Sequence, residues 1–432
     1  MMAAPRRGFE TAEYAARTAR ALAAMEAHAE EPLAGIVITS PPTIRYFTGF
    51  ETTFWESPTR PFFVILVPGR TAPIAVVPDL GEVGMRQAFT SEVRTWASPE
   101  IGDGASPKFG DGASPEIGDG ASQTGSAGVH EGLEALWAAI CETMTSLGTR
   151  SGGATAYTAA RIGFELGPEM AMRWSTGAFL ALRRRLGGDR IADATPLLWR
   201  LRMIKSAAEL EKIAKACRIA SDAFAAVPER IAAGCKEREA AATFRDLLFG
   251  AGADQVPFIA AASGAAGYLQ IVAGPSDRHL TRGDILFLDT GVVHDGYFCD
   301  FDRNFAVGAP EVAVERAYDA LLRATDAAIN ALRPGLRAAE ICAVIGRSLE
   351  DAGYAVSATG RMGHGFGLQL TEPPSLALQD ATVLEAGMAL TIEPAITLGG
   401  GRLLVHEENV SLQADGAQWL STPAPRSLPR LR

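Results

Sequence analysis

Two carboxylates inside a hydrophobic hairpin constrain the fold of this chain more than any other feature. The stretch LFLDTGVVHDGYFCDFDRNF, residues 286–305, has the pattern of two apolar β-strands joined by a turn. Asp289 and Asp300 lie within it. A four-residue turn at 293–296 places the two aspartates directly opposite each other, whereas a two-residue turn at 295–296 makes them diagonal neighbours. Both registers keep the two side chains on one face of the hairpin, about 5–8 Å apart.

Ionised carboxylates this close together in apolar surroundings repel each other and lose hydration. A shared proton, a bound cation, or a different register that brings one aspartate to the solvent would each relieve the conflict. Three further motifs favour the cation: His364 stands between glycines in GHGFG, Glu393 ends the apolar run MALTIEP, and Glu407 begins the strand-like VHEENVSL. Four carboxylates and one imidazole form a hard ligand set that suits Mn²⁺, Co²⁺, Fe²⁺ or Zn²⁺, as a pair bridged by carboxylates.

Helical and strand patterns mix along the chain without strict alternation, which predicts an α+β fold rather than a doubly wound sheet. The predicted helices cover 10–30, 131–147, 168–186, Ser206 to about Ala226, 237–250, 313–332 and 337–352. The predicted strands cover 35–39, 62–67, 73–78, 162–166, 285–292, 297–306, 388–393 and 403–412. The capping box of Ser206 and Glu209 opens the long central helix, so we place a domain boundary here, between residues 1–200 and 201–432.

An octapeptide repeat interrupts the first domain. ASPEIGDG, ASPKFGDG and ASPEIGDG follow one another over residues 97–120, and Ala121 and Ser122 begin a further copy. Eight residues are too few for a solenoid coil that buries a core. Gly, Pro, Ser and Asp dominate, so we predict a flexible surface insertion over 97–126.

Charge and composition restrict the binding partners and the cellular compartment that we expect for this chain. The chain has 432 residues, a net charge of −10 and a pI near 5.3, without a basic stripe, which argues against nucleic acid and anionic membranes as partners. No apolar stretch reaches the ~18 residues of a membrane span, and the N-terminal residues lack the apolar core of a signal peptide. The five cysteines are scattered and form no CxxC pair. We therefore predict a cytoplasmic protein with reduced thiols.

The motifs LDTG, GYFCDFDRNFAVG, GHGFGLQLTEPP, TIEP and VHEENV resemble, in order and spacing, those of the creatinase/prolidase/methionine-aminopeptidase family. The resemblance covers roughly residues 200–415 and implies the pita-bread metallohydrolase fold, Xaa-Pro peptidase-like in type. The stretch SPPTIRYFTGF resembles the smaller creatinase-type N-terminal α/β domain. The resemblance also implies a homodimer and two divalent metal ions, Mn²⁺ first among them. It places the metal ligands on Asp289, Asp300, His364, Glu393 and Glu407, with Glu393 also the proton acceptor.

The chain departs from the family pattern at positions where the peptidases hold their substrate. Thr371 stands where those enzymes have a second histidine, residues 270–272 lack a histidine, and Val405 replaces an arginine. Thr371 can donate one hydrogen bond but cannot carry a proton at neutral pH as an imidazole does. Asp302 stands where the family usually has threonine, on the same strand face as Asp300.

Arg60 is a further candidate for substrate binding. In creatinase-like relatives an arginine in this region reaches the partner subunit's site and binds a substrate carboxylate, a task that suits the bidentate guanidinium. The alternative is a surface arginine beside a strand.

The leading hypothesis is a dinuclear-metal-dependent hydrolase of C–N bonds that acts on a small peptide, as Xaa-Pro peptidases do. The departures favour an alternative, a small non-peptide amide or amidine of the kind that creatinase or ectoine hydrolase takes. A metal-dependent lyase and a non-catalytic binding protein on the same fold are the other hypotheses.

Overall fold

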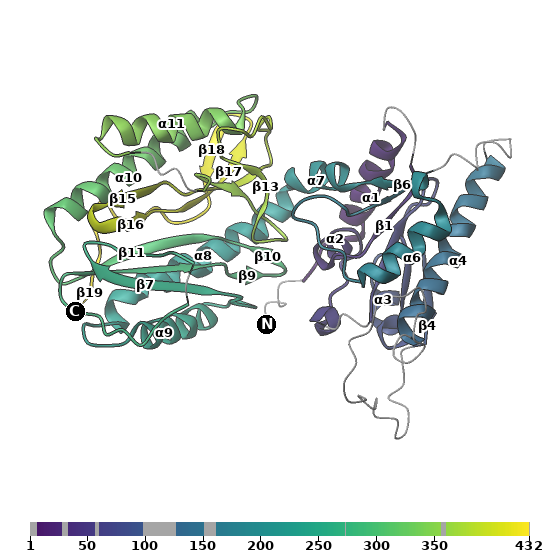
Figure 1. Cartoon of the computed structure of the whole chain (residues 1–432), viewed down its shortest axis with the longest axis horizontal. Helices are drawn as coiled ribbons and strands as arrows, with labels where there is room; N and C mark the ends of the chain where they lie inside the picture. Colours follow the sequence, from purple (N-terminus) through teal and green to yellow (C-terminus); the bar gives the residue numbers. More distant parts are fainter. Residues whose placement is uncertain are drawn as a thin grey trace, which may run out of the picture. The chain divides into compact units, whose positions relative to one another are not determined.

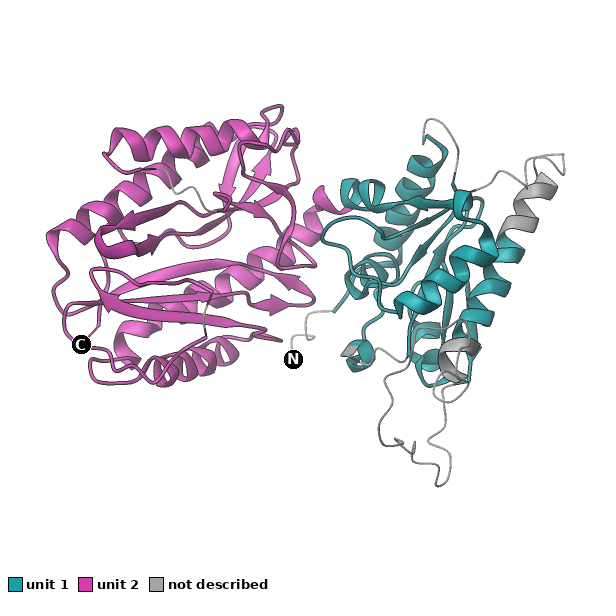
Figure 2. Cartoon of the chain, in the orientation of Figure 1, with its two compact units in different colours: residues 1–201 teal, residues 202–432 magenta. Residues whose placement is uncertain are grey.

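The computed structural model describes residues 7–27, 33–56, 60–97, 127–150, 161–272, 274–355 and 360–431, with only the backbone of 127–131 and 144–150. The chain divides into two compact units, Met1–Leu201 and Arg202–Arg432, which are coloured separately in Figure 2. The predicted octapeptide insertion lies outside the described residues, apart from Ala97.

The first unit is built on a six-stranded mixed sheet. Its strands, in spatial order, are β4 (Glu92–Trp96), β3 (Ile74–Pro78), β2 (Phe63–Leu66), β1 (Leu33–Ile38), β5 (Arg161–Phe164) and β6 (Ile191–Asp193). The pairs β1–β2 and β2–β3 are antiparallel and the others are parallel. The β2–β3 pair is the hairpin that the two apolar runs around residues 68–70 predict.

Helices accompany this sheet. They are α1 (Thr11–Glu26), α2 (Pro41–Thr48), α3 (Glu82–Gln87), α4 (Ala127–Arg150), α6 (Thr176–Leu186) and α7 (Thr195–Met203). The prediction of a helix from residue 168 is wrong at its start, because α6 begins only after Ser175, whose hydroxyl accepts a hydrogen bond from the Ala178 N–H as an N-cap. Buried side chains of α4 and α6 pack with those of β1, β2 and β3 in the core of this unit.

The second unit contains two larger sheets. The four-stranded sheet has the order β19 (Arg430–Leu431), β11 (Phe301–Val307), β8 (Asp284–Thr290) and β7 (Ile259–Ala265). The five-stranded sheet has the order β13 (Glu372–Ser375), β12 (His364–Gly365), β14 (Ala389–Ile392), β17 (Glu408–Gln413) and β18 (Gly416–Trp419). The unit also contains two separate two-stranded ribbons, β9 (Val293–His294) with β10 (Tyr297–Phe298), and β15 (Ala395–Leu398) with β16 (Arg402–Val405).

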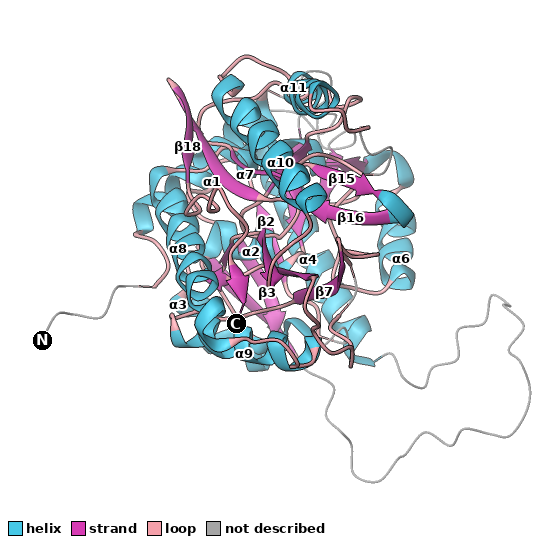
Figure 3. Ribbon diagram, turned by 90° about the vertical axis from the view of Figure 1, so that its left-hand side faces the viewer, coloured by secondary structure: helices cyan, strands magenta, loops and turns pink. Residues whose placement is uncertain are grey.

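Two helix pairs cover these sheets (Figure 1). The helices are α8 (Ala207–Arg230), α9 (Glu237–Gly250), α10 (Val312–Ala331) and α11 (Ala338–Asp351). Helix α9 packs on α8 and β7, whereas α10 packs on α11 and on the β15–β16 ribbon, as Figures 1 and 3 also show. Both hydrogen bonds of the predicted capping box form at the start of α8, between Ser206 and Glu209. Among the helices that the structure describes, none combines the length and the apolar character needed to cross a membrane.

The hairpin that carries the first two candidate ligands has the shorter of the two predicted turns. Strands β9 and β10 pair His294 with Tyr297, which leaves Asp295 and Gly296 as a two-residue turn. Both turn residues have positive φ, 47° and 81°, as a type I′ turn requires. The same register continues into β8 and β11, where Asp289 pairs with Asp302. Asp300 is therefore the diagonal neighbour of Asp289, and the four-residue alternative is wrong.

Candidate metal centre

The five predicted metal ligands come from both sheets of the second unit. Asp289 lies in β8 and Asp300 directly precedes β11, so the four-stranded sheet supplies two carboxylates. The five-stranded sheet supplies His364 from β12, Glu393 from the residue after β14 and Glu407 from the residue before β17. Sequence segments more than a hundred residues apart thus converge where the two sheets meet.

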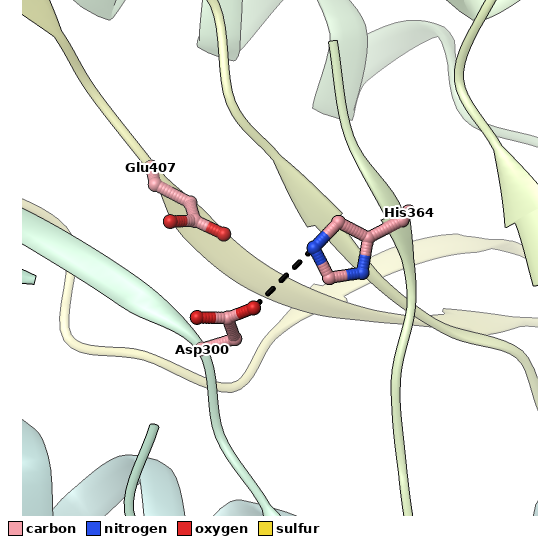
Figure 4. Close-up of side chains that lie close together, drawn as sticks. All are labelled: Asp300, His364 and Glu407. Carbon is pink, nitrogen blue, oxygen red and sulfur yellow. Dashed lines mark ion pairs between the residues drawn. The ribbon is translucent and has the colours of Figure 1, made fainter. Parts of the chain in front are cut away.

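Three of these residues form a compact cluster, which Figure 4 shows in close-up. Ligand atoms of Asp300, His364 and Glu407 all lie within 4.8 Å of one another, and all three side chains are buried. The Nε2 atom of His364 is 3.3 Å from Oδ2 of Asp300. Asp289 and Glu393 lie outside this compact group but close enough to act on its charges, as described below.

Local backbone geometry aims the imidazole of His364 at the carboxylates. Its Nδ1 is 2.8 Å from the carbonyl oxygen of Gly365, an arrangement in which Nδ1 carries the proton and Nε2 keeps a lone pair for a cation. The glycine is required here, because a Cβ on Gly365 would lie 2.2 Å from the carbonyl oxygen of Pro373. A Cβ on Gly363 would lie equally close, 2.2 Å, to the carbonyl oxygen of Thr391. The GHG sequence therefore lets β12 pass close to both neighbouring strands.

Asn409 of β17 fixes the backbone of Asp300. Its side-chain oxygen accepts a hydrogen bond from the Asp300 N–H at 2.9 Å, and its NH₂ donates to the Asp300 carbonyl oxygen at 2.5 Å. This pair of bonds ties the four-stranded sheet to the five-stranded sheet at the cluster. Hydrogen bonds of this kind hold a metal-binding residue in one orientation.

Hydrogen bonds also fix the backbone of Glu407. Its N–H donates to Oδ1 of Asp302 at 2.8 Å, and its carbonyl oxygen accepts from Arg303 at 2.9 Å. Arg303 also pairs with Glu408 at 2.8 Å. Burial raises the pKa of Glu408, but Arg303 and then His406 outweigh it and bring that pKa to about 2. Glu408 is thus a stable anion that anchors Arg303 behind the site.

The electrostatics of the protein alone disfavour four ionised carboxylates. Burial raises the pKa of Asp289 and Glu407 well above the ordinary range, and the charge of Asp300 raises both further. Burial raises the pKa of Asp300 to about 8 and that of Glu393 to about 7, although Arg361 opposes both shifts. A compensating positive charge is needed before all of these groups can be anionic at neutral pH.

The donor atoms fit a divalent cation. In the part of the chain that the structure describes, Oδ1 of Asp289 and Oε1 of Glu407 are buried and take part in no hydrogen bond. Buried polar atoms of this kind are costly unless they are satisfied. Four carboxylates and one imidazole with an available lone pair match the preferences of hard to borderline divalent metals.

The positions that depart from the family pattern differ in their burial and in their contacts. Thr371, half-buried, accepts a hydrogen bond from Arg361 at 3.2 Å, and the same arginine lies 3.6 Å from Glu393. Val405 is buried, and its N–H donates to the hydroxyl of Tyr268 at 2.7 Å. Of the 270–272 segment, Val272 is exposed. Two departures are thus linked to candidate ligands by described contacts: Thr371 to Glu393 through Arg361, and Asp302 directly to the Glu407 N–H.

Arg60 belongs to the first unit, three residues before β2 begins at Phe63, and is half-buried. Its Nε is buried and has no hydrogen-bond partner among the described residues. Its role in substrate binding stays a prediction.

Sequence reasoning missed two residues of the site. Asn409 lies two residues after Glu407, in the same motif, and this position is the signal that could have identified it. Arg361 lies three residues before His364, and its contact with Glu393 arises only when β12 and β14 come together in the fold.

The comparisons with known proteins agree with this geometry. The model of metallopeptidase family M24 matches residues 211–414, and the creatinase/prolidase N-terminal domain matches residues 17–204. The chain belongs to metallopeptidase family M24. The predicted family, the α+β class and the pita-bread fold with a creatinase-type N-terminal domain are therefore confirmed.

Several relatives are named as dipeptidases. The chain is 36% identical over 226 residues to an Xaa-Pro dipeptidase of Pyrococcus furiosus, a match that spans 51% of this chain and 64% of that protein. It is 34% identical to an Xaa-Pro dipeptidase of Pyrococcus horikoshii, over 51% of this chain and 63% of that protein. The crystal structure of dipeptidase PepE from Mycobacterium ulcerans superposes with a TM-score of 0.74 at 30% identity, and covers 98% of this chain and 99% of that one. The sequence matches thus span slightly less than two thirds of the two curated relatives.

Proposed function

We propose that this protein is a dinuclear-metal-dependent hydrolase that cleaves the C–N bond of Xaa-Pro dipeptides. The observation that carries the proposal is the convergence of Asp300, His364 and Glu407 within 4.8 Å in a member of family M24. The names of the two Pyrococcus relatives support the choice of Xaa-Pro dipeptides as substrates.

The proposed metal site uses all five predicted ligands. Asp289, Asp300, His364, Glu393 and Glu407 would hold two divalent ions, with Mn²⁺ the first candidate and Co²⁺, Fe²⁺ or Zn²⁺ as alternatives. When bound, such ions supply Lewis acidity, which polarises an amide carbonyl and lowers the pKa of water. The unsatisfied buried oxygens of Asp289 and Glu407 support this use of the site.

The chain's own residues would then position the substrate and accept a proton during hydrolysis. Glu393 is our candidate for the proton acceptor, because its side chain is 21% exposed and so reaches both the cluster and the solvent. Thr371 is the candidate to hold the substrate by one hydrogen bond. Its hydroxyl cannot exchange a proton at neutral pH as the family's histidine can, so proton transfer in this chain falls to Glu393.

Thr371 also favours a second candidate function, the hydrolysis of a small non-peptide amide or amidine. A site without the second histidine gives a scissile carbonyl fewer strong donors than the peptidases provide. A metal-dependent lyase differs from both hydrolases in the mass of its products, because hydrolysis adds water and elimination does not.

We further propose that the enzyme is a cytoplasmic homodimer in which Arg60 contributes to the partner subunit's site. The resemblance to creatinase-type enzymes supports the dimer. The five cysteines are all free thiols, which supports a reducing compartment. A monomer found by light scattering would contradict the dimer and remove the basis for Arg60.

The test is hydrolysis of a panel of Xaa-Pro di- and tripeptides, followed by mass spectrometry with Mn²⁺-loaded protein and an Asp300→Asn control. We expect cleavage of the dipeptides that disappears in the control. If a folded, metal-loaded protein leaves the whole panel intact, the peptidase proposal is wrong, and small carboxylate-bearing amides and amidines become the substrates to test.

A further inference from the structure

Asp302 is a sixth acidic residue beside the candidate metal centre, and the set of five proposed ligands leaves it without a role. In the register of β8 and β11 it pairs directly with Asp289. Directly opposed residues of an antiparallel pair put their side chains on the same face of a sheet. The two carboxylates therefore lie side by side on one face, and Asp302 is completely buried there.

One oxygen of Asp302 has a partner and the other has none. Oδ1 accepts a hydrogen bond from the Glu407 N–H at 2.8 Å, so the residue contacts the backbone of a proposed ligand. Oδ2 is buried and has no hydrogen-bond partner among the described residues. In the same part of the chain, Oδ1 of Asp289 and Oε1 of Glu407 share this condition. A cation common to the three carboxylates would satisfy all three oxygens.

The basic side chains of Arg303 and His406 lie near Asp302 but interact with other groups. The guanidinium of Arg303 donates to three backbone carbonyl oxygens and to the carboxylate of Glu408. Nδ1 of His406 is 3.9 Å from Oδ1 of Asp302, too far for a hydrogen bond, whereas its Nε2 is 3.4 Å from Oε1 of Glu408. Neither side chain supplies a partner for Oδ2 of Asp302.

We infer that Asp302 is a sixth metal-binding residue, whose Oδ2 binds one of the two ions together with Asp289 and Glu407. This inference rests on the proposed function. The threonine that the family usually has at this position offers one neutral hydroxyl, whereas Asp302 offers a charged oxygen and still accepts the Glu407 N–H. An added carboxylate oxygen favours Mn²⁺, which takes six oxygen ligands, over Zn²⁺, which prefers four ligands.

The test measures the binding of Mn²⁺ and of Zn²⁺ by chelator competition, and the metal content by elemental analysis. Asp302→Asn keeps an acceptor for the Glu407 N–H and removes the charge, and Asp302→Thr introduces the residue that is usual in the family. The matched control is Asp319→Asn, whose carboxylate is 59% exposed and pairs with Arg323. This control should bind both metals as wild type does.

Both Asp302 variants should lose one of the two Mn²⁺ ions, because the compact cluster of Asp300, His364 and Glu407 remains. The affinity for the affected Mn²⁺ should fall by about 100-fold or more, beyond the roughly 10- to 100-fold loss expected for a residue that only orients a ligand. The loss of affinity for Zn²⁺ should be smaller by about tenfold. In Mn²⁺-soaked crystals of wild type, an anomalous difference peak should lie in contact with Oδ2 of Asp302.

Four results would overturn the inference. Unchanged Mn²⁺ content and affinity in Asp302→Asn would show that Oδ2 binds no ion. Tighter binding in that variant would show that Asp302 shares a proton with Asp289 and competes with the ion. An equal loss for Mn²⁺ and Zn²⁺, or anomalous peaks that all lie away from Oδ2, would show that Asp302 only positions Glu407. The crystallographic measurement uses wild type, so it decides the question even if a variant does not fold.

Peptide hydrolysis, measured on the same preparations, separates this inference from the proposed function. If wild type binds two Mn²⁺ ions in a manner that depends on Asp302 but cleaves no peptide, the inference holds and the proposed reaction fails. If wild type cleaves Xaa-Pro dipeptides and Asp302→Asn retains both ions, the reaction stands and the inference is wrong. If wild type binds no Mn²⁺, the inference is wrong together with the proposed metal site.

Discussion

Replacing Glu372 with glutamine should destabilise the second unit strongly. Glu372 begins β13, and its carboxylate lies 2.6 Å from Arg202 and 2.9 Å from Lys205. The three side chains are only 1–2% exposed. Glu372→Gln keeps the shape of the side chain but leaves two buried cations without their anion.

The magnitude follows from the burial of the group. Removal of one partner from a buried ion pair costs about 3–5 kcal/mol, because the remaining charge stays desolvated. Replacing all three groups by apolar side chains removes the uncompensated charges as well. The triple variant Arg202→Met, Lys205→Met, Glu372→Leu should therefore lie within about 2 kcal/mol of wild type.

Urea unfolding at neutral pH measures both effects. With a slope near 3 kcal/mol per M, the midpoint of Glu372→Gln should fall by about 1 M or more at an unchanged slope. The control is Glu315→Gln, whose carboxylate is 49% exposed and 3.9 Å from Arg430, and it should change stability by less than about 1 kcal/mol. The reasoning fails if Glu372→Gln is as mild as this control, or if the triple variant is less stable than Glu372→Gln.

Further predictions concern acid stability and the supports of the metal centre. Burial raises the pKa of Glu372, but Lys205 and Arg202 outweigh it and hold the pKa below its ordinary value. The contribution of Glu372 to the free energy of unfolding should thus be complete above the unfolded pKa of about 4.3 and lost as the pH falls through the folded pKa. The difference in stability between wild type and Glu372→Gln should therefore narrow in acid. A constant difference in urea titrations across this pH range contradicts the assignment. Asn409→Ala removes both side-chain bonds to the Asp300 backbone and should weaken Mn²⁺ binding by about 10- to 100-fold in chelator competition, whereas unchanged affinity would show that these bonds do not orient the ligand. In Gly365→Ala the new Cβ would meet a β13 carbonyl oxygen at 2.2 Å, while in Gly399→Ala it would meet nothing within 4 Å. The first should cost about 3 kcal/mol or more in thermal unfolding and the second little, and equal costs would refute the steric argument.

The candidate ligands could be predicted from the sequence because each one breaks a local rule. Asp289 and Asp300 are carboxylates in apolar strands, His364 stands between two glycines, and Glu393 and Glu407 border apolar runs. Such conflicts between residue type and surroundings mark functional sites. The sequence does not decide the pairing register, because both turn lengths put the aspartates on one face.

Other features depend on contacts that no local pattern encodes. Strand β7 has the sequence IAAASGA, in which one isoleucine is the only β-branched residue, and it becomes a strand by pairing along the whole of β8. Arg361 and Asn409 join the site only when separate strands meet. Tertiary context, rather than propensity, decides these cases.

The central claim is that the five residues hold two divalent ions, and the number of bound metal ions tests it most directly. Protein loaded with Mn²⁺ and freed of excess ion should retain two equivalents per chain by elemental analysis. Asp300→Asn, with an unchanged circular dichroism spectrum, should retain fewer than one, because Asp300 is part of the compact cluster with His364 and Glu407 that would hold the ions. Less than one equivalent in wild type, or the same content in both proteins, would contradict the account.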